Sequence, residues 1–389
     1  MAGGTGSPAG GRAEPGLRAG AMRASPGDRA SALVRTLHGG LDRLLFFLHY
    51  AKAQTADRGL PLGTRLDLLR HGFLPSSGRL YRSMTPASRG DYLADYPRYC
   101  RTPFINGDYR FCLDDKAVFG GLLQRYPDHA PRTLAAIYRG RLLPVRNVPG
   151  GGGASLEELV AAHAKVVLKP AGGAGGRGVM FVEAAPGGDF LVGGERRTVA
   201  GLRAEVGRLD SHVVEEFVRQ HPALERLHPA TTNTVRLFTM RDPDNGEPFV
   251  AGAVLRIGTG RSRPVDTFAR GGLCAAVDLG TGRLGPAMGR TADGSAAPHA
   301  SHPETGAPVA GVEVPGWRSV TGRILEFCAD LHFLSYVGWD LAITEGGFRV
   351  IEDNSHPDMQ LLQVHGPLLA DPRARRFYEA HGVVRRRPA

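Results

Sequence analysis

Residues 338–354 read GWDLAITEGGFRVIEDN, and this stretch decides the interpretation of the whole chain. Two largely apolar runs flank the tripeptide 345–347, and a glycine at a left-handed position is typical of a three-residue hairpin loop. The pattern therefore predicts two antiparallel strands joined by this loop. With such a loop, Thr344 lies opposite Phe348, and every earlier pair of residues follows by counting back along both strands.

The predicted hairpin brings acidic side chains together. Counting back places Asp340 directly opposite Glu352, and Asn354 projects from the same face because it is two residues further on. Carboxylates at directly opposed positions repel each other. A hard cation between them removes the repulsion, and Mg²⁺ typically binds through one or two carboxylates and substrate phosphates. We predict that these three residues are metal ligands. The alternative is an exposed hairpin whose acidic groups are solvated, and the hairpin alone does not decide between the two.

Composition narrows the class of protein. The 389 residues are enough for two or three structural units, and 42% hydrophobic with 22% charged residues is ordinary for a globular chain. The net charge of +10 indicates an anionic partner, such as nucleotide phosphate, nucleic acid or a membrane surface. Much of the excess is in the two ends of the chain, as Arg12, Arg18, Arg23, Arg29, Arg385, Arg386 and Arg387. Solvated basic tails explain this better than nucleic-acid contact, so we do not expect nucleic acid as a partner.

Cysteine usage and hydropathy point to the cytoplasm. The four cysteines, Cys100, Cys112, Cys274 and Cys328, form no Cys-x-x-Cys pair, which argues against a zinc site and a disulfide scaffold. No stretch reaches the roughly 18 consecutive apolar residues of a transmembrane helix. The first thirty residues lack the apolar core of a secretory signal. We predict a cytoplasmic protein with a disordered N-terminal tail.

The chain changes character several times. Leucines at three- and four-residue steps predict a helix over 31–57, whose apolar stripe packs on a core or, less plausibly, on a membrane surface. The following segment, 59–106, is rich in turn residues and tyrosines and is predicted to be irregular. The predicted units are a disordered tail (1–30), an accessory helical or irregular region (31–112), a first lobe with a glycine-rich flap (113–218), a second lobe with the metal site (219–370) and a basic tail (371–389).

Strands and helices are mixed from about residue 114 onward. Apolar runs predict strands at 134–145, 166–169, 179–182, 212–218, 234–240 and 249–257. Helical spacing predicts helices at 115–119, 156–163, 199–209 and 318–331. The polar segment 291–308 is predicted to be a mobile loop. This order predicts an α+β protein with a nucleotide cleft between two lobes.

A glycine-rich segment lies between two of these strands. Glycines allow backbone N–H groups to close around phosphate oxygens, because no Cβ obstructs them. The glycines are Gly172, Gly173, Gly175, Gly176 and Gly178, and Lys169 at the end of the preceding strand can place its charge on the same phosphates. No Gly-Lys-Ser/Thr follows and no helix begins here, so this is neither a P-loop nor a dinucleotide-binding fingerprint. We predict a phosphate-binding flap; a simple glycine turn is the alternative.

Two further strands carry charge. Glu215 and Glu216 lie inside an apolar run, where an unpaired charge is costly, so they either bind adenine and ribose groups or pair with a neighbouring arginine. Thr234 and Arg236 share one face of a strand, and arginine offers a fork of donors suited to carboxylate or phosphate. A polar, glycine-bearing loop with Arg270 follows.

Together these motifs resemble the ATP-grasp superfamily, and most closely its sugar-transfer-associated branch, over residues 114–367. The matching segments, in order, are Asp115-Lys116, Lys169 to Gly178, Glu215 to Val218, Asn233 to Arg236, and the set Asp340, Glu352 and Asn354. The resemblance implies an ATP-grasp fold, in which two α+β lobes clamp ATP. It also implies that Lys116 and Lys169 hold the phosphates and that Glu215, Glu216, Phe217 and Val218 form the adenine hinge.

The resemblance further implies ATP and Mg²⁺ as cofactors and a ligase that joins a small-molecule carboxylate to an amine through an acylphosphate. Such a reaction fits natural-product or cell-surface biosynthesis. The metal ligands would be Asp340, Glu352 and Asn354. Arg236 and Lys169 would be catalytic, supported by Arg256 and Arg270. The alternatives are a small-molecule kinase and a non-catalytic nucleotide-binding partner of a polysaccharide assembly.

The chain departs from the family pattern at two positions. Many peptide-forming members have an arginine two residues before the first metal acid, where this chain has Gly338. The acidic residue expected to bind ribose is also replaced, because Gln220-His221 stands near its place and Glu225 comes later. His356, beside the metal set, is interpreted as structural or supporting. The sequence determines neither the two substrates nor the oligomeric state.

Overall fold

The structure is a computed structural model that describes residues 59–145, 155–173 and 175–386, and residues 40–53 apart from 42, 43, 46 and 49. Residues 1–45 and 46–389 separate into two units, and the fold described here is that of the second unit. The described residues between 40 and 53 are helical, within the helix predicted at 31–57. The predicted tail at 1–30 lies outside the described residues.

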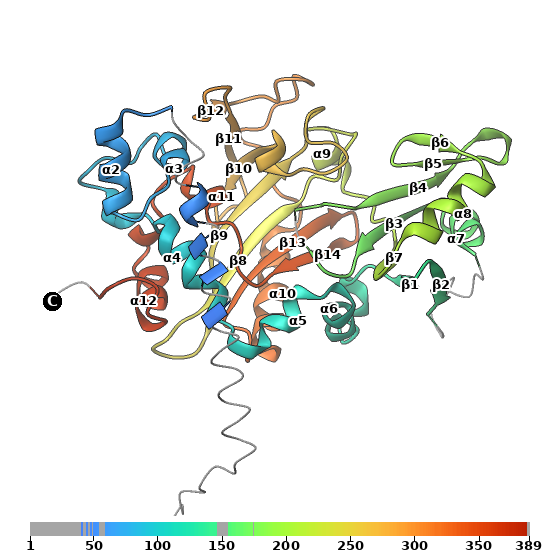
Figure 1. Cartoon of the computed structure of the whole chain (residues 1–389), viewed down its shortest axis with the longest axis horizontal. Coiled ribbons are helices and arrows are strands. Elements are labelled where there is room, and N and C mark those ends of the chain that lie inside the picture. The colour runs from blue at the N-terminus through green and yellow to red at the C-terminus, as the bar shows by residue number, and fades with distance from the viewer. Residues whose placement is uncertain are drawn as a thin grey trace, which may run out of the picture. The chain divides into compact units, whose positions relative to one another are not determined.

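Two seven-stranded antiparallel sheets form the framework of this unit (Figure 1). The first sheet has the order β2-β1-β7-β3-β4-β5-β6 and the second has the order β12-β11-β10-β9-β8-β13-β14. The strands of the first sheet are β1 (Thr133–Tyr138), β2 (Arg141–Pro144), β3 (Lys165–Pro170), β4 (Met180–Ala184), β5 (Phe190–Val192), β6 (Glu195–Arg197) and β7 (His212–Glu216). The strands of the second sheet are β8 (Val235–Arg241), β9 (Pro248–Ile257), β10 (Leu273–Val277), β11 (Leu284–Arg290), β12 (Ala296–His299), β13 (Tyr336–Thr344) and β14 (Gly347–Asn354).

Short helices surround the sheets. The α-helices are α2 (Leu62–Arg70), α3 (Pro75–Leu80), α4 (Asp95–Cys100), α5 (Phe111–Asp114), α6 (Lys116–Leu123), α7 (Leu156–His163), α8 (Val199–Arg208), α9 (Pro222–Glu225), α10 (Trp317–Asp330), α11 (Gln360–Gln363) and α12 (Pro372–Ala380). The 3₁₀ helices are η1 (Arg89–Asp91), η2 (Thr102–Phe104), η3 (Gly107–Arg110), η4 (Pro127–His129), η5 (Pro186–Gly188), η6 (Phe268–Arg270) and η7 (Leu368–Ala370). No helix of the described part is both long enough and apolar enough to cross a membrane.

The second sheet is covered on both faces, which is why its central strands are apolar on both sides. Val235 and Leu237 of β8 share one core with α10 and with Phe119 of α6. Phe238 and Met240 of the same strand share another core with the segment 68–93 and with α12. In Figure 1 these accessory helices and α12 lie alongside the second sheet, away from the first. The accessory region is therefore part of the covering of the second sheet.

The first sheet has a core of its own. Leu134, Val166, Val182 and Val214 pack there against α7 and α8, with buried residues that include Leu159 and Leu202. Both helices begin at a side-chain cap: Ser155 Oγ accepts from the N–H of Glu158, and Thr198 Oγ1 accepts from the N–H of Gly201. These caps explain why the predicted bounds of both helices agree closely with the structure.

Several predicted elements differ from the structure. The single strand predicted at 134–145 is a hairpin, because Arg139 and Gly140 both have positive φ (49° and 73°) and form a two-residue turn. The predicted mobile loop at 291–308 contains β12, which pairs with β11. The short strands β5, β6, β10 and β11 were not predicted. The irregular segment 59–106 is mainly a series of short helical turns.

Candidate active site

The hairpin of β13 and β14 has a tighter turn than predicted. Thr344 pairs with Gly347, so the predicted pairing of Thr344 with Phe348 is wrong. A β-bulge, in which Ile351 is the extra residue, then shifts the register, and Asp340 lies opposite Glu352 as predicted. The two departures from the predicted geometry compensate each other, and the acidic pair is confirmed.

The two carboxylates of this pair have different surroundings. Asp340 is fully buried and accepts hydrogen bonds from Nε and Nη2 of Arg236, the latter at 2.7 Å, while Arg256 Nη2 lies 3.0 Å from Asp340 Oδ2. Burial acts to raise the pKa of Asp340, but the charges of Arg236 and Arg256 outweigh it, and the pKa is lowered. Glu352 is partly exposed, and its Oε1 lies 3.4 Å from Nζ of Lys116. Asp340 therefore fixes two guanidinium groups, whereas Glu352 faces the cavity described below.

Polar atoms beside Glu352 have no partner among the described residues. Asp353 Oδ1 and Asn354 Nδ2 are both buried and make no hydrogen bond there. Burial raises the pKa of Asp353, and the nearby charge of Glu352 adds to the effect. Asp353 is not one of the predicted metal ligands, although it stands between two of them. This end of β14 therefore carries one carboxylate oxygen and one amide nitrogen that no described residue satisfies.

The residues at this end of the hairpin meet the needs of Mg²⁺ only in part. Within the described residues there is no group of three or more His, Cys, Asp or Glu side chains placed to hold a metal ion. The oxygen-rich end of β14, with Glu352 and Asn354, fits a hard cation that takes its remaining ligands from substrate phosphates. Asp340 fits less well, because arginine donors already engage both of its oxygens.

Lys169 lies at the end of β3 and is largely buried. Its Nζ donates to Glu215 Oε2 at 2.6 Å and to the backbone oxygen of Ile351 at 3.1 Å. Glu216 pairs instead with Arg132, whose Nε lies 2.7 Å from Glu216 Oε2. Glu215 and Glu216 were expected either to bind adenine and ribose groups or to pair with an arginine. Both form ion pairs: Glu216 pairs with an arginine, whereas Glu215 pairs with Lys169. Lys169 is thereby positioned between the two sheets.

The helix α6 positions the second lysine. Asp115 caps the helix by accepting from the N–H groups of Ala117 and Val118, at 2.9 and 3.0 Å. Lys116 then stands at the first position of the helix, and its Nζ donates to the backbone oxygen of Gly173 at 2.8 Å. This contact joins the helix to the glycine-rich segment.

The glycine-rich segment has the backbone geometry that only glycine adopts easily. Gly173, Gly175, Gly176 and Gly178 all have positive φ, between 66° and 104°, whereas Gly172 does not. A Cβ on Gly176 would lie 2.8 Å from Val265 Cγ1 of the second lobe. Glycine is thus required there both by conformation and by the close approach of the flap to the 265–267 loop.

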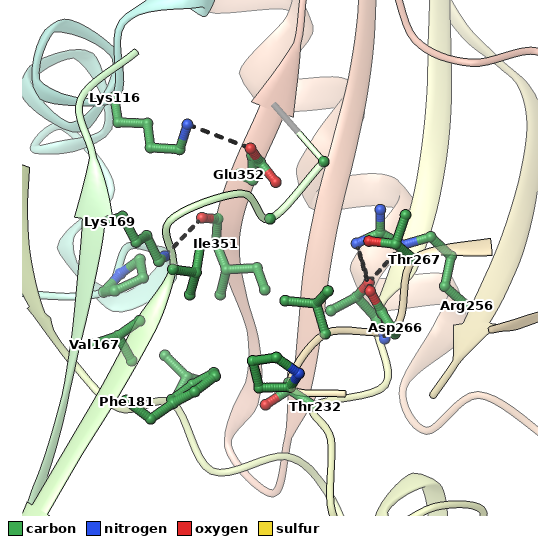
Figure 2. A pocket seen from close by; sticks show the side chains of 18 of the residues that line it. Lys116, Val167, Lys169, Phe181, Thr232, Arg256, Asp266, Thr267, Ile351 and Glu352 are labelled. Carbon is green, nitrogen blue, oxygen red and sulfur yellow. Dashed lines mark hydrogen bonds and ion pairs between the residues drawn. The ribbon is translucent and has the colours of Figure 1, made fainter. Parts of the chain in front are cut away.

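A cavity lies where the flap, the two lysines and the hairpin meet (Figure 2). It contains about 790 Å³ of space between atoms, some of it open to solvent. One part of its wall is apolar, with Val167, Phe181 and Ile351, and another is polar, with Thr267, Asp266 and Arg256. Lys116 and Glu352 approach each other at the upper edge in Figure 2. An apolar wall beside a row of charges suits a ligand with a flat apolar ring at one end and anionic groups at the other.

The polar wall is a connected network. Thr234 donates to Asp266 Oδ2 through its N–H (2.9 Å) and its hydroxyl (2.5 Å), and Arg256 Nη2 lies 3.0 Å from Asp266 Oδ1. Burial raises the pKa of Asp266, although the charge of Arg256 opposes the effect. Asp266 thus connects two strands of the second sheet to the 265–267 loop. Asp266 is a residue of this site that the sequence motifs did not predict.

The structure brings most of the predicted site residues together. Lining this cavity are Lys116, Lys169, Gly175, Gly176, Glu216, Val218, Arg256 and Glu352. A neighbouring second cavity is lined by Gly173, Arg236, Arg270 and Asn354. Glu215 and Asp340 line neither cavity and act through their basic partners. The side chain of Phe217 lies elsewhere, beside Lys165 Nζ, which is 4.6 Å from its ring centre.

Residues considered for ribose binding are separated by the structure. The side-chain amide of Gln220 is used within the protein, because it donates to Thr231 O at 2.7 Å and accepts from Asn233 N at 2.8 Å. His221 caps α9 by accepting from the N–H of Ala223. Glu225 lines a third cavity, which shares Phe181 and Thr232 with the first. Glu225 is therefore the one of these three residues that places a charged group near the apolar end of the cleft.

Two antiparallel sheets with a glycine flap, two lysines and a carboxylate around one cavity define an ATP-grasp fold. The sequence model of the sugar-transfer associated ATP-grasp family matches residues 102–377, and the chain belongs to this family.

The chain is distantly similar to several solved structures. D-alanine-D-alanine ligase from Coxiella burnetii is 13% identical, with 70% of this chain and 59% of that chain covered and a TM-score of 0.36. Biotin carboxylase from Campylobacter jejuni is 11% identical, with 72% and 48% covered and a TM-score of 0.39. N5-carboxyaminoimidazole ribonucleotide synthetase from Thermotoga maritima is 13% identical, with 63% and 42% covered and a TM-score of 0.31. The chain thus spans about half the length of these proteins. A comparison with curated proteins gives no match.

Proposed function

We propose that this protein is an ATP- and Mg²⁺-dependent ligase that joins a carboxylate to an amine through an acylphosphate. One observation carries the proposal: Lys116, Lys169, Glu352 and Arg256 line one cavity beneath a glycine flap. Phosphoryl transfer depends mainly on positioning and on neutralising oxygen charge, and this set supplies both.

The nucleotide would lie along the cleft. The adenine ring suits the apolar wall near Val167, Phe181 and Val218, and the phosphates suit the end with Lys116 and Lys169. The ion pair with Glu215 and the contact with Ile351 O hold Lys169 in place before the nucleotide arrives. Mg²⁺, held by Glu352 and Asn354, would neutralise charge on the phosphate oxygens. The flap would cover the phosphates and exclude water from a reactive intermediate.

The proposed reaction has two steps. A carboxylate oxygen of the substrate attacks the γ-phosphorus, the bond between that phosphorus and the β–γ bridging oxygen breaks, and ADP leaves. An amine then attacks the acyl carbon, the carbon–oxygen bond to phosphate breaks, and the amine loses a proton. Arg256 is the better placed arginine for the transferred phosphoryl group, because it lines both cavities. Arg236 lines the second cavity and is fixed by Asp340.

The test is the dependence of phosphate release on both substrates. Full-length protein with ATP and Mg²⁺ is assayed against panels of acids and amines, with product mass measured in parallel. We expect phosphate release when an acid and an amine are both present. A phosphorylated hydroxyl product would identify a kinase instead, and the absence of turnover and of nucleotide binding would contradict the proposal.

Site variants test the residue roles. We expect Lys169→Ala and Glu352→Gln each to lower turnover by about 100-fold or more, because each removes charge complementarity at the phosphates. Circular dichroism checks that both variants remain folded. Glu313→Gln is the matched control, since Glu313 is exposed, pairs with the exposed Arg283 and lines none of the cavities described above. Near-normal activity in either site variant would overturn the role of that residue.

A further inference from the structure

The second cavity is larger than the nucleotide cleft and adjoins it. It contains about 1960 Å³ of space between atoms, part of it open to solvent. Lys116, Gly175, Arg256 and Thr267 line both cavities. A molecule in the second cavity therefore reaches the end of the cleft where the phosphates are proposed to lie.

The wall of this cavity is strongly basic. Among the described residues that line it, seven are lysine or arginine and three are aspartate, namely Asp114, Asp353 and Asp358. Two of these acids are already paired: Arg110 Nε lies 3.0 Å from Asp114 Oδ2, and Arg98 Nη1 lies 2.9 Å from Asp358 Oδ1. Cavity walls with an excess of one charge attract ligands of the opposite sign.

Besides Lys116, which lines both cavities, the remaining basic groups are four arginines in two sets. Arg236 and Arg256 lie at the phosphate end, held by the buried Asp340 and Asp266. Arg177 of the glycine flap and Arg270 at the end of η6 are exposed, and within the described part of the chain neither has a recorded side-chain partner. These two arginines come from different lobes of the cleft.

We propose that the second cavity binds the carboxylate substrate and that this substrate carries a second anionic group, held by Arg177 and Arg270. The inference rests on the proposed function and deepens it by assigning the substrate class: an acid with a further phosphate or carboxylate. The reacting carboxylate lies near Arg256, and the distal anion takes the two arginines that have no partner among the described residues. Guanidinium groups suit both anions, because their forked donors match carboxylate and phosphate oxygens.

The accessory region contributes to the same cavity. Arg98 and Tyr99 of α4 and Arg110 of η3 line it. Arg98 is held by the buried Asp95, with Nη2 3.0 Å from Oδ1, and by Asp358. This segment therefore helps to select the substrate by closing one side of its pocket.

Calorimetry on the full-length protein tests the inference, with Mg²⁺ and a non-hydrolysable ATP analogue present. The probes are two matched pairs: 3-phosphoglycerate with glycerate, and succinate with monomethyl succinate. Each pair differs by one anionic group, so the two arms distinguish phosphate from carboxylate. We expect, in at least one pair, that the acid with the second anionic group binds about tenfold more tightly than its matched monoanion, the usual scale for hydrogen bonds to charged groups.

Variants locate the effect. Arg177→Gln and Arg270→Gln should each reduce the preference for the acid with the second anionic group while binding of the ATP analogue is retained. Arg270→Lys should keep part of this preference. Arg318→Gln, an exposed arginine of α10, is the control. Equal binding of the two acids in both pairs, or a preference that survives when Arg177→Gln and Arg270→Gln are combined, would overturn the inference. If the wild-type protein did not bind the ATP analogue, the result would instead contradict the proposed nucleotide site.

Discussion

At the scale of single residues, the ammonium group of Lys169 is held in the cleft by contacts from both sheets. It is 9% exposed and contacts Glu215 and the backbone of Ile351, so its position depends on both sheets. An ammonium group in such a place needs a partner, because burial of an unpaired charge is costly. Before nucleotide binds, Glu215 is that partner; with nucleotide bound, phosphate oxygens can share the role.

Replacing Glu215 tests this arrangement. We expect Glu215→Gln to lower the free energy of unfolding of the free protein by about 1–3 kcal/mol, the usual cost of a buried group that loses a charged partner. A saturating ATP analogue should recover part of the loss, since phosphates then face Lys169. Urea unfolding with and without the analogue measures both effects. Glu183→Gln, on β4 of the same sheet, is the control, and an equal loss of stability in both variants would contradict this role of Glu215.

His365 provides a test of burial through pH. Burial lowers its pKa to about 4, and its Nε2 lies 3.6 Å from Cys274 Sγ. The unfolded chain therefore binds a proton below its ordinary pKa of about 6.5, while the folded protein stays neutral down to about 4. The neutral histidine therefore stabilises the folded protein fully above pH 6.5. This contribution to the free energy of unfolding is lost as the pH falls from about 6.5 to about 4.

We expect His365→Gln to remove this loss, which is roughly 2–3 kcal/mol as an upper bound. Urea unfolding at pH 5 and at pH 7 gives the free energy of unfolding at each pH, and the difference between them is compared between wild type and variant. The exposed His332→Gln variant serves as the control and should retain the wild-type difference. An unchanged pH dependence in His365→Gln would show that this histidine is not the cause.

At the scale of elements, the hairpin of β13 and β14 depends on Gly338, two residues before Asp340. A Cβ on Gly338 would lie 2.5 Å from Pro357 Cβ and 3.4 Å from Arg236 Cδ. The side chain of Arg236, from the adjacent strand β8, therefore occupies space beside Gly338 and reaches Asp340 from there. A guanidinium still reaches this acid, although it comes from another strand.

Gly338→Ala should disturb this arrangement. Overpacking a filled site typically costs about 1–3 kcal/mol, and here either Pro357 or Arg236 must move. We expect lower thermal stability together with a reduced rate of phosphate release. Gly285→Ala on β11 is the matched control, because the nearest atom to its Cβ would be 3.9 Å away. Stability and activity equal to those of the control would show that the close approach tolerates a methyl group.

At the scale of the whole described unit, the accessory region and the second sheet share one core. Leu80, Tyr81 and Leu93 pack with Phe238 of β8 in that core. Asn106 adds a polar link, since its Nδ2 donates to Tyr336 O at 2.7 Å and its Oδ1 accepts from Ser335 N at 2.9 Å. The first sheet has a separate core. We expect the accessory region to unfold together with the second sheet.

Hydrogen exchange tests this division. Asn106→Ala leaves buried backbone groups of β13 without partners, so exchange should rise in the accessory region and in β8 and β13. Exchange in β3, β4 and β7 should remain unchanged. Asn245→Ala, in an exposed turn where the side chain accepts from Glu247 N, is the control. A uniform rise across both sheets would mean that the two cores unfold as one.

The sequence alone determined the features that depend on neighbouring residues. Helices α7 and α8 were predicted closely because their caps and apolar spacing are local, and the order of motifs predicted the family. The opposition of Asp340 and Glu352 followed from counting along one hairpin, although a shorter turn and a bulge at Ile351 produce it. Short strands such as β10 and β12 were missed, since their pairing partners rather than their own composition make them strands.

Only the tertiary structure decided which charges meet. Arg236 and Asp340 are 104 residues apart, and Lys169 and Glu215 are 46 apart, so no local pattern predicts either pair. The second cavity combines the accessory region, the glycine flap and the end of β14. A local pattern limits the conformation of one segment, whereas ion pairs and cavities depend on the packing of segments that are distant along the chain.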